Sequence, residues 1–418
     1  MDRMVNIGLR GMTLVSKFLL IISLAAFLEP KELGLYGLLT ATISFAIYPL
    51  GFDFYTYTTR ELIKRDRSEW GGLLRDQGVL HLVLYALVMP LLLLVFSMEL
   101  LPWHLVGWFF ALLVVEHLNQ ELMRLLVAMS QQLAASWVLF LRSGAWAIAI
   151  TVWLFLDPEV RKLEVVLLSW TLGGLLALTV AALRLAQLNL AGWLGRVNWH
   201  WMISGVKVAL PFLASTLAIR AVFTIDRYWF GALQGLEVLG AYVLFMGIAN
   251  ALLSFLDAGV FAFSYPNLIA AHDRDAPEVF RAGLFRMLWQ TLLLTALFVF
   301  ISLLVIKPVL LLLDKPFYTS QISLFPWVLV AIMLYAIGMV PHYGLYAQGR
   351  DKHIILSHLG AVAVFIPVTA LLAVKTPDKA VLLGLIITFS VLLIWKTWAF
   401  VRVTPDHYYS AATVGEIK

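Results

Sequence analysis

The chain has 418 residues, of which 62% are hydrophobic and 13% are charged, and its formal net charge is +5. Soluble domains carry about 25% charged residues, so this composition excludes a soluble enzyme. The absence of cysteine excludes disulfides, thiolate metal sites and a catalytic thiol. About twelve membrane crossings of roughly 20 residues each fit the length and leave no room for a separate globular domain.

Apolar runs, broken by charged residues, proline and glycine, predict the crossings in chain order. All must be helices, because unpaired backbone groups are too costly in lipid. The predicted fold class is therefore an all-α polytopic membrane protein. The predicted spans are 8–28, 35–58, 77–98, 105–128, 137–156, 164–186, 206–227, 238–263, 286–306, 323–346, 354–374 and 380–401. A cleaved signal peptide is the alternative for the first span, but that apolar run is too long for one and has Lys17 at its centre.

The positions of lysine and arginine predict the orientation. With the N-terminus in the cytoplasm, most of the 30 Lys and Arg residues fall on the cytoplasmic side, as the positive-inside rule requires. The longest hydrophilic connections, 59–76, 187–205 and 264–285, fall on that side too. We expect a multi-pass membrane protein with both termini in the cytoplasm, and the absence of cysteine fits a bacterial plasma membrane.

An internal repeat divides the chain near its midpoint. Leu33-Gly34-Leu35-Tyr36 and Leu239-Gly240-Ala241-Tyr242 open the second and eighth predicted spans, 206 residues apart. Each motif is followed by an apolar run and then by an acid, Asp53 or Asp257, close to a glycine and to aromatic residues. Two six-helix halves are a known transporter plan, with the substrate site between the halves. We therefore expect two pseudo-symmetric six-helix bundles, 1–200 and 201–418, around a central cavity.

The repeat and its flanks resemble a known family. The similar stretches are Ser16-Lys17-Phe18-Leu19-Leu20, Glu32-Leu33-Gly34-Leu35-Tyr36-Gly37, Gly51-Phe52-Asp53-Phe54-Tyr55, Thr59-Arg60-Glu61-Leu62, and Asp226-Arg227 ahead of the second motif. They resemble the Wzx-type polysaccharide (O-antigen) flippases of the multidrug/oligosaccharidyl-lipid/polysaccharide (MOP) exporter superfamily. The resemblance implies movement of an undecaprenyl-pyrophosphate-linked oligosaccharide from the inner to the outer leaflet. It implies a transporter rather than an enzyme, with no nucleotide-binding domain.

The same reading sets the expected partners and the alternatives. The partners are the lipid-linked glycan, membrane lipid, and a polysaccharide polymerase with its chain-length regulator, while no cofactor, metal or nucleic acid is expected. The first alternative is a multidrug or other lipid-headgroup exporter of the same superfamily. The second is a membrane glycan polymerase or ligase, which the short outer loops disfavour because they carry few histidines and carboxylates.

Three cations in the predicted spans are candidate substrate-binding residues. A charge near the bilayer centre is costly, so it is expected to face a cavity or a partner. Lys17 and Arg220 lie deep in the first and seventh spans, and Arg142 lies about one turn inside the fifth. Arginine and lysine suit a pyrophosphate group. The alternatives are pairing with acids on neighbouring helices and, for Arg142 and Arg220, snorkelling to the interface.

Acids in the spans are candidates for coupling and gating. Glu116, near the middle of the fourth span, is the candidate ion-coupling residue, and Glu121 is expected to form a salt bridge with Arg124. Asp53 and Asp257 are candidate gating residues, with a fixed interhelical salt bridge as the alternative. His117 and Glu121 are not interpreted as a metal pair. His342 and His358 are interpreted as ordinary hydrogen-bonding side chains.

Overall fold

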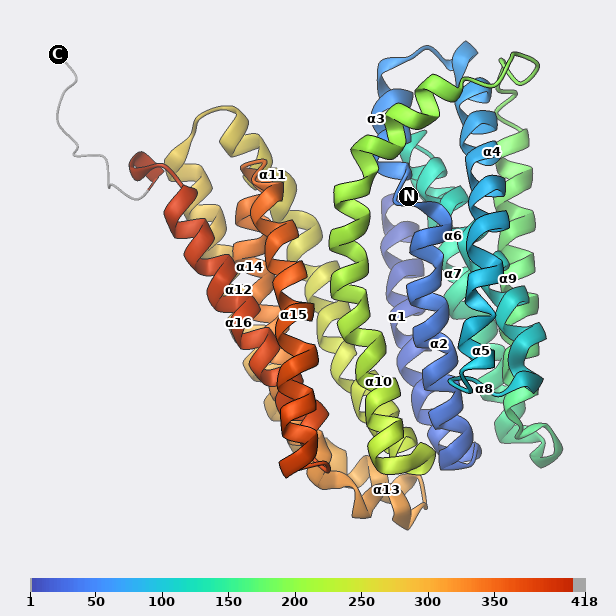
Figure 1. The fold of residues 1–418 in the computed structure, drawn as a ribbon, viewed down its shortest axis with the longest axis vertical. Coiled ribbons are helices and arrows are strands. Elements are labelled where there is room, and N and C mark those ends of the chain that lie inside the picture. Colours follow the sequence, from blue (N-terminus) through green and yellow to red (C-terminus); the bar gives the residue numbers. More distant parts are fainter. Residues whose placement is uncertain (1, 409–418) are drawn as a thin grey trace. The chain divides into compact units, whose positions relative to one another are not determined.

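The computed structural model describes residues 2–408, which are helical and contain no strand (Figure 1). The chain forms two compact units, 1–244 and 245–418. The helices that lie wholly in the first unit are α1 (Asp2–Phe27), α2 (Pro30–Gly51), α3 (Tyr55–Lys64), α4 (Arg67–Leu92), α5 (Leu94–Ser97), α6 (Val106–Ala128), α7 (Gln132–Phe140), α8 (Trp146–Leu156) and α9 (Leu163–Ala186). The helices that lie wholly in the second are α11 (Ala262–Asp273), α12 (Pro277–Leu312), α13 (Pro316–Ser320), α14 (Phe325–Ala347), α15 (Asp351–Lys375) and α16 (Ala380–Val403). The helix α10 (Trp199–Leu256) begins in the first unit and ends in the second.

The predicted all-α membrane fold is confirmed. Ten helical segments of the described residues are long and apolar enough to cross a membrane. The segment Trp199–Asp273 is counted once among them, although it has 75 residues and is broken at Gly235, where φ is +83°. A residue with a side chain rarely adopts this φ, so glycine permits the break and separates the seventh and eighth predicted spans. The 23-residue helix α6 is absent from the ten because its polar run from Glu116 to Arg124 lowers its hydropathy.

Several helices begin earlier than the predicted spans, and two of the differing boundaries move a candidate site residue. The helix α2 ends at Gly51 rather than at residue 58, because Phe52 and Asp53 have φ of +55° and +48° and stop the helix. Asp53 therefore lies in a turn beyond the span. The fifth span begins at Gln132, so Arg142 lies about three turns inside it rather than one. The C-terminal residue Lys418, which the predicted orientation puts in the cytoplasm, lies outside the described residues.

The start of α2 is fixed by its own sequence. Glu29 and Glu32 form a capping box, in which the Glu29 backbone N–H donates to the Glu32 carboxylate at 3.1 Å. Pro30 occupies the first turn, where its missing N–H costs nothing. The other Glu32 oxygen accepts from the backbone N–H of Leu163 at 3.1 Å, and this bond ties the start of α9 to the start of α2.

The two copies of the repeat pack against each other within the first unit. Gly34 lies against the Leu236 carbonyl, Gly240 lies against the Pro30 carbonyl, and a Cβ on either glycine would overlap that oxygen. Pro30 and Leu236 are equivalent positions in the two copies, as are Gly34 and Gly240, so the contact is reciprocal. Small residues allow membrane helices to approach this closely. The repeated glycine is therefore explained by a helix crossing between α2 and the second part of α10.

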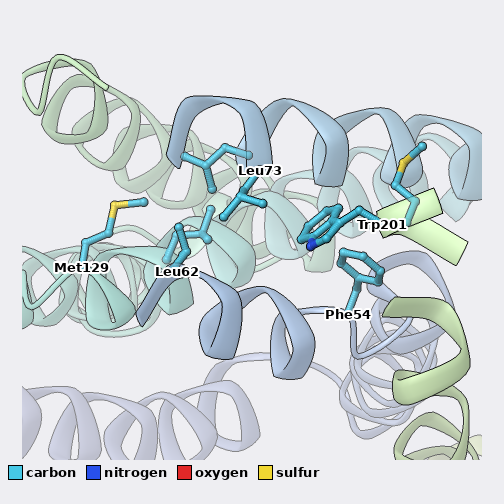
Figure 2. Close-up of a cluster of buried hydrophobic side chains, with 8 residues drawn as sticks. Phe54, Leu62, Leu73, Met129 and Trp201 are labelled. Atoms are coloured by element: carbon cyan, nitrogen blue, oxygen red, sulfur yellow. The ribbon is translucent and has the colours of Figure 1, made fainter. Parts of the chain in front are cut away.

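A buried hydrophobic cluster holds one end of the first unit together and positions the turn that contains Asp53 (Figure 2). Its members come from α3, α4, α6, α10 and the α2–α3 turn: Phe54, Leu62, Leu73, Leu74, Leu125, Met129, Trp201 and Met202. The Phe54 and Trp201 rings meet edge to face at 5.3 Å. Because Phe54 is fully buried next to Asp53, the packing of its ring fixes the backbone of the turn.

The connection between α9 and α10, residues 187–198, is fastened to α4. The Arg75 guanidinium donates to the carbonyls of Trp193 (3.3 Å), Gly195 and Arg196 (2.7 Å). The same guanidinium pairs with Asp76 at 2.6 Å. One arginine therefore satisfies several loop carbonyls at once.

Replacing Arg75 is expected to loosen this connection. Arg75→Ala removes charge-assisted hydrogen bonds, whose loss costs about 1.5–3 kcal/mol. We expect a lower melting temperature in detergent and faster proteolysis within residues 187–198. Arg67→Ala is the matched control, because Arg67 is exposed on the same helix and only stacks on Trp70. Equal proteolysis of the two variants would contradict the assignment.

Candidate functional site

The first charged centre is a buried ion pair between α6 and the turn that joins α7 to α8. The Arg142 Nε and Nη2 atoms lie 2.6 and 2.5 Å from Oε2 of Glu116, and Trp170 Nε1 donates to Oε1 at 2.8 Å. Glu116 is 7% exposed and Arg142 is 9% exposed. Both carboxylate oxygens are therefore engaged. The snorkelling alternative for Arg142 is wrong, because its side chain binds the buried Glu116 and does not extend to the membrane interface.

The backbone at Arg142 is unusual. Leu141–Ala145 forms a π-helical turn, a feature that recurs at functional sites because it inserts a residue into the regular helix. Trp146 Nε1 donates to the Arg142 carbonyl at 2.7 Å. The Trp146 ring also stacks on Trp170 at 5.9 Å, with an angle of 11° between the ring planes. The two tryptophans thus flank the Glu116–Arg142 pair.

Lys17 of α1 belongs to the same centre. Its ammonium lies within electrostatic range of Arg142 and Glu116, and α1 packs against α7, the Leu141–Ala145 turn and α8. Lys17 is nevertheless exposed, unlike the two residues of the pair. Arg10, also exposed, precedes Lys17 by about two turns and lies on the same face of α1. Along this face the accessible charge is positive.

The second charged centre lies around the Asp53 turn. Asp53 is 4% exposed, accepts a hydrogen bond from Thr216, and lies within electrostatic range of Arg124 and Arg220. Burial raises the pKa of the Asp53 carboxyl, and the Thr216 hydrogen bond and the two arginines oppose that rise. The backbone of Asp53 is also in the left-handed region, which is rare for a non-glycine residue and concentrates at functional sites.

Arg220 is the exposed member of this second centre. It lies on α10 with its guanidinium carbon 5.3 Å from the centre of the Tyr48 ring, close enough for a cation–π contact. One turn later, Thr224 donates to the Ala41 carbonyl at 3.4 Å and holds this part of α10 against α2. Arg220 and Lys17 thus each place an accessible cation within the helices of the first unit.

A buried polar network centred on α6 adjoins Asp53 through Arg124. Glu121 Oε1 pairs with Arg124 at 2.8 Å, which confirms the expected salt bridge, and Gln77 donates to Oε2 at 2.8 Å. The Arg124 guanidinium carbon lies 3.7 Å from the centre of the Tyr55 ring. Glu121 is therefore an internal structural acid.

Sequence reasoning missed the residues that α4 contributes to this network. Tyr85 bonds to His117 Nδ1 at 2.6 Å, the His81 and His117 rings lie 5.0 Å apart, and His81 Nε2 is 4.0 Å from Glu121. The signal was present, since Gln77, His81 and Tyr85 follow one another at four-residue spacing on one helix face. In the part of the chain that the structure describes, no three histidine or acidic side chains are grouped so as to hold a metal ion.

Asp257 lies in the second unit. It is exposed and is the first residue of a π-helical turn, Asp257–Phe261, which follows α10. It interacts electrostatically with Tyr343 of α14. The gating roles of Asp53 and Asp257 stay predictions, as do the substrate-binding roles of Lys17, Arg142 and Arg220 and the coupling role of Glu116.

Comparison with solved structures identifies the fold. The chain is similar to the inward-facing conformation of a multidrug resistance MATE family transporter of the MOP superfamily, with a TM-score of 0.76 at 14% identity over 96% of this chain and 99% of that one. It is also similar to the outward-facing conformation of such a transporter, with a TM-score of 0.59 at 15% identity over 96% and 97% of the two chains. A MATE protein in a bent conformation gives a TM-score of 0.61 at 14% identity over 98% and 95%. No protein-family model and no curated protein matched the sequence.

These similarities establish the fold and no more. At 14–15% identity they show that the chain shares the all-helical fold of these solved structures. The solved structures represent inward-facing and outward-facing states, which is the pair of conformations that alternating access requires. The function of this chain has to be argued from its own residues.

Proposed function

We propose that the chain is a flippase for undecaprenyl-pyrophosphate-linked oligosaccharide, the repeat unit of O-antigen or a related surface polysaccharide. The observation that carries the proposal is the sign of the accessible charge within the first unit. Lys17 and Arg220 are exposed, whereas the acids Glu116 and Glu121 are buried and paired with arginine. A cargo that meets these helices therefore meets positive charge.

The headgroup chemistry fits this arrangement. A pyrophosphate carries negative charge and several acceptor oxygens, which arginine binds through two parallel hydrogen bonds and lysine binds as a point charge. The basic face of α1, with Arg10 and then Lys17, would lead an anionic group from the helix start to mid-membrane. The lipid tail would stay in the bilayer, so the protein has to shelter only the headgroup.

The ion pair offers a way to couple cargo to protons. A pyrophosphate that reached Lys17 would compete with Glu116 for Arg142, because both are anions that bind the same guanidinium. Glu116, once released, would be a buried carboxylate without its cation and would take up a proton. In this scheme Arg142 binds substrate, Glu116 couples transport to protons, and Asp53 and Asp257 act as gates.

The membrane would be the bacterial inner membrane, with both termini cytoplasmic, and a polymerase with its chain-length regulator would receive the product.

One observation favours a second candidate, a multidrug exporter. Asp257 is an exposed acid in the second unit, and an accessible carboxylate is what a cationic drug requires. The solved relatives described as multidrug resistance transporters share the fold. Two accessible cations in the first unit argue against a cationic cargo there.

The test is a cell that depends on this chain for its surface polysaccharide. We expect Lys17→Ala/Arg220→Ala to abolish surface glycan and to accumulate the lipid-linked precursor inside, while the protein still inserts into the membrane. The matched control is Lys31→Ala/Lys207→Ala, which removes two exposed cations from the first turns of α2 and the early part of α10. Normal surface glycan in the first double variant would contradict the proposal. Export of cationic dyes that depends on Asp257 would favour the second candidate.

A further inference from the structure

The second unit contains a cluster of basic side chains that the proposed transport path does not use. Lys396, on α16, is only 1% exposed. His342 of α14 and His358 of α15 stack on each other, with ring centres 5.8 Å apart and 10° between the planes. Lys396 lies within electrostatic range of His342. Three ionisable groups from three helices therefore meet inside one bundle.

Helix register explains why these residues meet. The helices α14 and α16 run parallel, because Gly344 packs on Phe400 and Gln348 donates to Thr404 at 2.8 Å. In both contacts the residue on α16 is 56 positions after its partner on α14. The same offset places His342 beside residue 398, which is within one turn of Lys396. The helix α15 runs antiparallel to α16, and Gly360 packs on Trp395. That pairing brings His358 to the level of Lys396.

The packing around Lys396 comes from two neighbouring helices. The helices packed against α16 are α14 and α15, and His342 of α14 lies within electrostatic range of Lys396. Tyr343 lies beside His342 at 5.5 Å between ring centres. Among the described residues, no Asp or Glu forms an ion pair with Lys396, and His342 Nδ1 is buried without a hydrogen-bond partner. Snorkelling does not account for Lys396, because its side chain does not reach the surface.

We propose that Lys396, His342 and His358 form a proton-binding site of the second unit, which takes up and releases a proton as the transporter changes conformation. Three like charges at one level repel one another, so the cluster holds fewer than three protons and its members titrate as a coupled set. The near-complete burial of Lys396 leaves room for a proton but not for a larger anion. Ionisable residues inside membrane helices commonly mark proton pathways. The inference rests on the proposed transport activity but concerns a unit and residues apart from Lys17 and Arg220.

The first test measures protonation directly and needs no substrate. The full chain, isotope-labelled at its lysine side-chain nitrogens, is placed in lipid nanodiscs and followed by solid-state NMR from about pH 5 to about pH 8, the range in which histidines titrate. We expect one lysine signal to change from ammonium to amine as the pH rises. This signal should be absent from Lys396→Met and shifted along the pH axis in His342→Gln. A Lys396 signal that stays ammonium over the whole range would overturn the proposal.

The second test measures coupling in proteoliposomes with a fluorescent short-chain polyprenyl-pyrophosphate glycan. A pH gradient should accelerate flipping by the wild type, and Lys396→Met and Lys396→Arg should both lose this acceleration. Lys375→Met, at the exposed end of α15, should keep it. Retained acceleration in Lys396→Met would overturn the proposal. A wild type that flips no lipid would refute the proposed function, while the NMR titration would still decide the proton site.

Discussion

Arg142→Ala is expected to destabilise the chain by about 3–5 kcal/mol, because it leaves the Glu116 carboxylate buried without its cation. The pair is 7% and 9% exposed and has contacts of 2.5 and 2.6 Å, so water cannot replace the guanidinium. Trp170 would still donate its hydrogen bond to this carboxylate. The measurement is unfolding in mixed micelles, followed by tryptophan fluorescence or circular dichroism.

A double variant separates the charge effect from packing. Glu116→Gln/Arg142→Met removes both charges and keeps similar volumes, and such replacements are often neutral. We therefore expect the double variant to be clearly more stable than Arg142→Ala. Arg10→Ala, which removes an exposed arginine from α1, should change stability little. If Arg142→Ala were as stable as Arg10→Ala, the pair would not be buried as described.

The same double variant distinguishes a structural from a functional pair. Under the proposed scheme, Arg142 passes from Glu116 to the pyrophosphate and Glu116 takes a proton. A stable double variant would then insert normally and still fail to flip lipid-linked glycan. Full transport by that variant would assign the pair to stability alone.

Gly34→Ala and Gly240→Ala are each expected to cost about 1–3 kcal/mol, the usual penalty for overpacking. The added Cβ meets a backbone carbonyl in both cases, Leu236 or Pro30, and a backbone atom cannot rotate away as a side chain can. The two helices have to separate to accept it. Gly78→Ala in α4 is the control, because nothing lies within 4 Å of its Cβ position. That substitution should be neutral or stabilising, since alanine favours a helix.

The two glycine variants should also couple. Once one alanine has pushed the helices apart, the second meets less resistance, so the cost of the double variant should fall short of the sum of the single costs. Thermal unfolding of the four proteins in one detergent gives this double-mutant cycle. Strict additivity would show that the two glycines do not share one crossing.

The features that followed from the sequence are those that one helix determines. Span positions and the i to i+3 salt bridge between Glu121 and Arg124 depend on residues close in the chain, and the repeat is found by comparing two stretches of sequence directly. The polar run in α6 was recognised as needing internal partners, because lipid offers none. Its partners on α4 were missed, because the sequence alone does not show which helix packs against α6.

The Asp53 turn shows a different limit. The apolar run continues through Phe52 and Phe54, so hydropathy predicts a helix to residue 58, yet the backbone turns left-handed at Phe52. A bulky residue rarely stops a helix in this way, and the conformation is sustained by the burial of Phe54 against Trp201. Arg142 was predicted too near the interface because the predicted span begins at residue 137, whereas the helix begins at Gln132.

The reciprocal crossing of Gly34 and Gly240 has an evolutionary consequence. A contact that maps onto itself when its two sides are exchanged is isologous, the type found in symmetric homodimers. Two separate copies of a half-length chain would make this same crossing with each other. Joining them into one polypeptide turns an interface between subunits into an internal contact. Each glycine is then retained because the backbone of the other copy leaves no room for a side chain. The two motifs are therefore expected to have resisted divergence while the residues around them specialised.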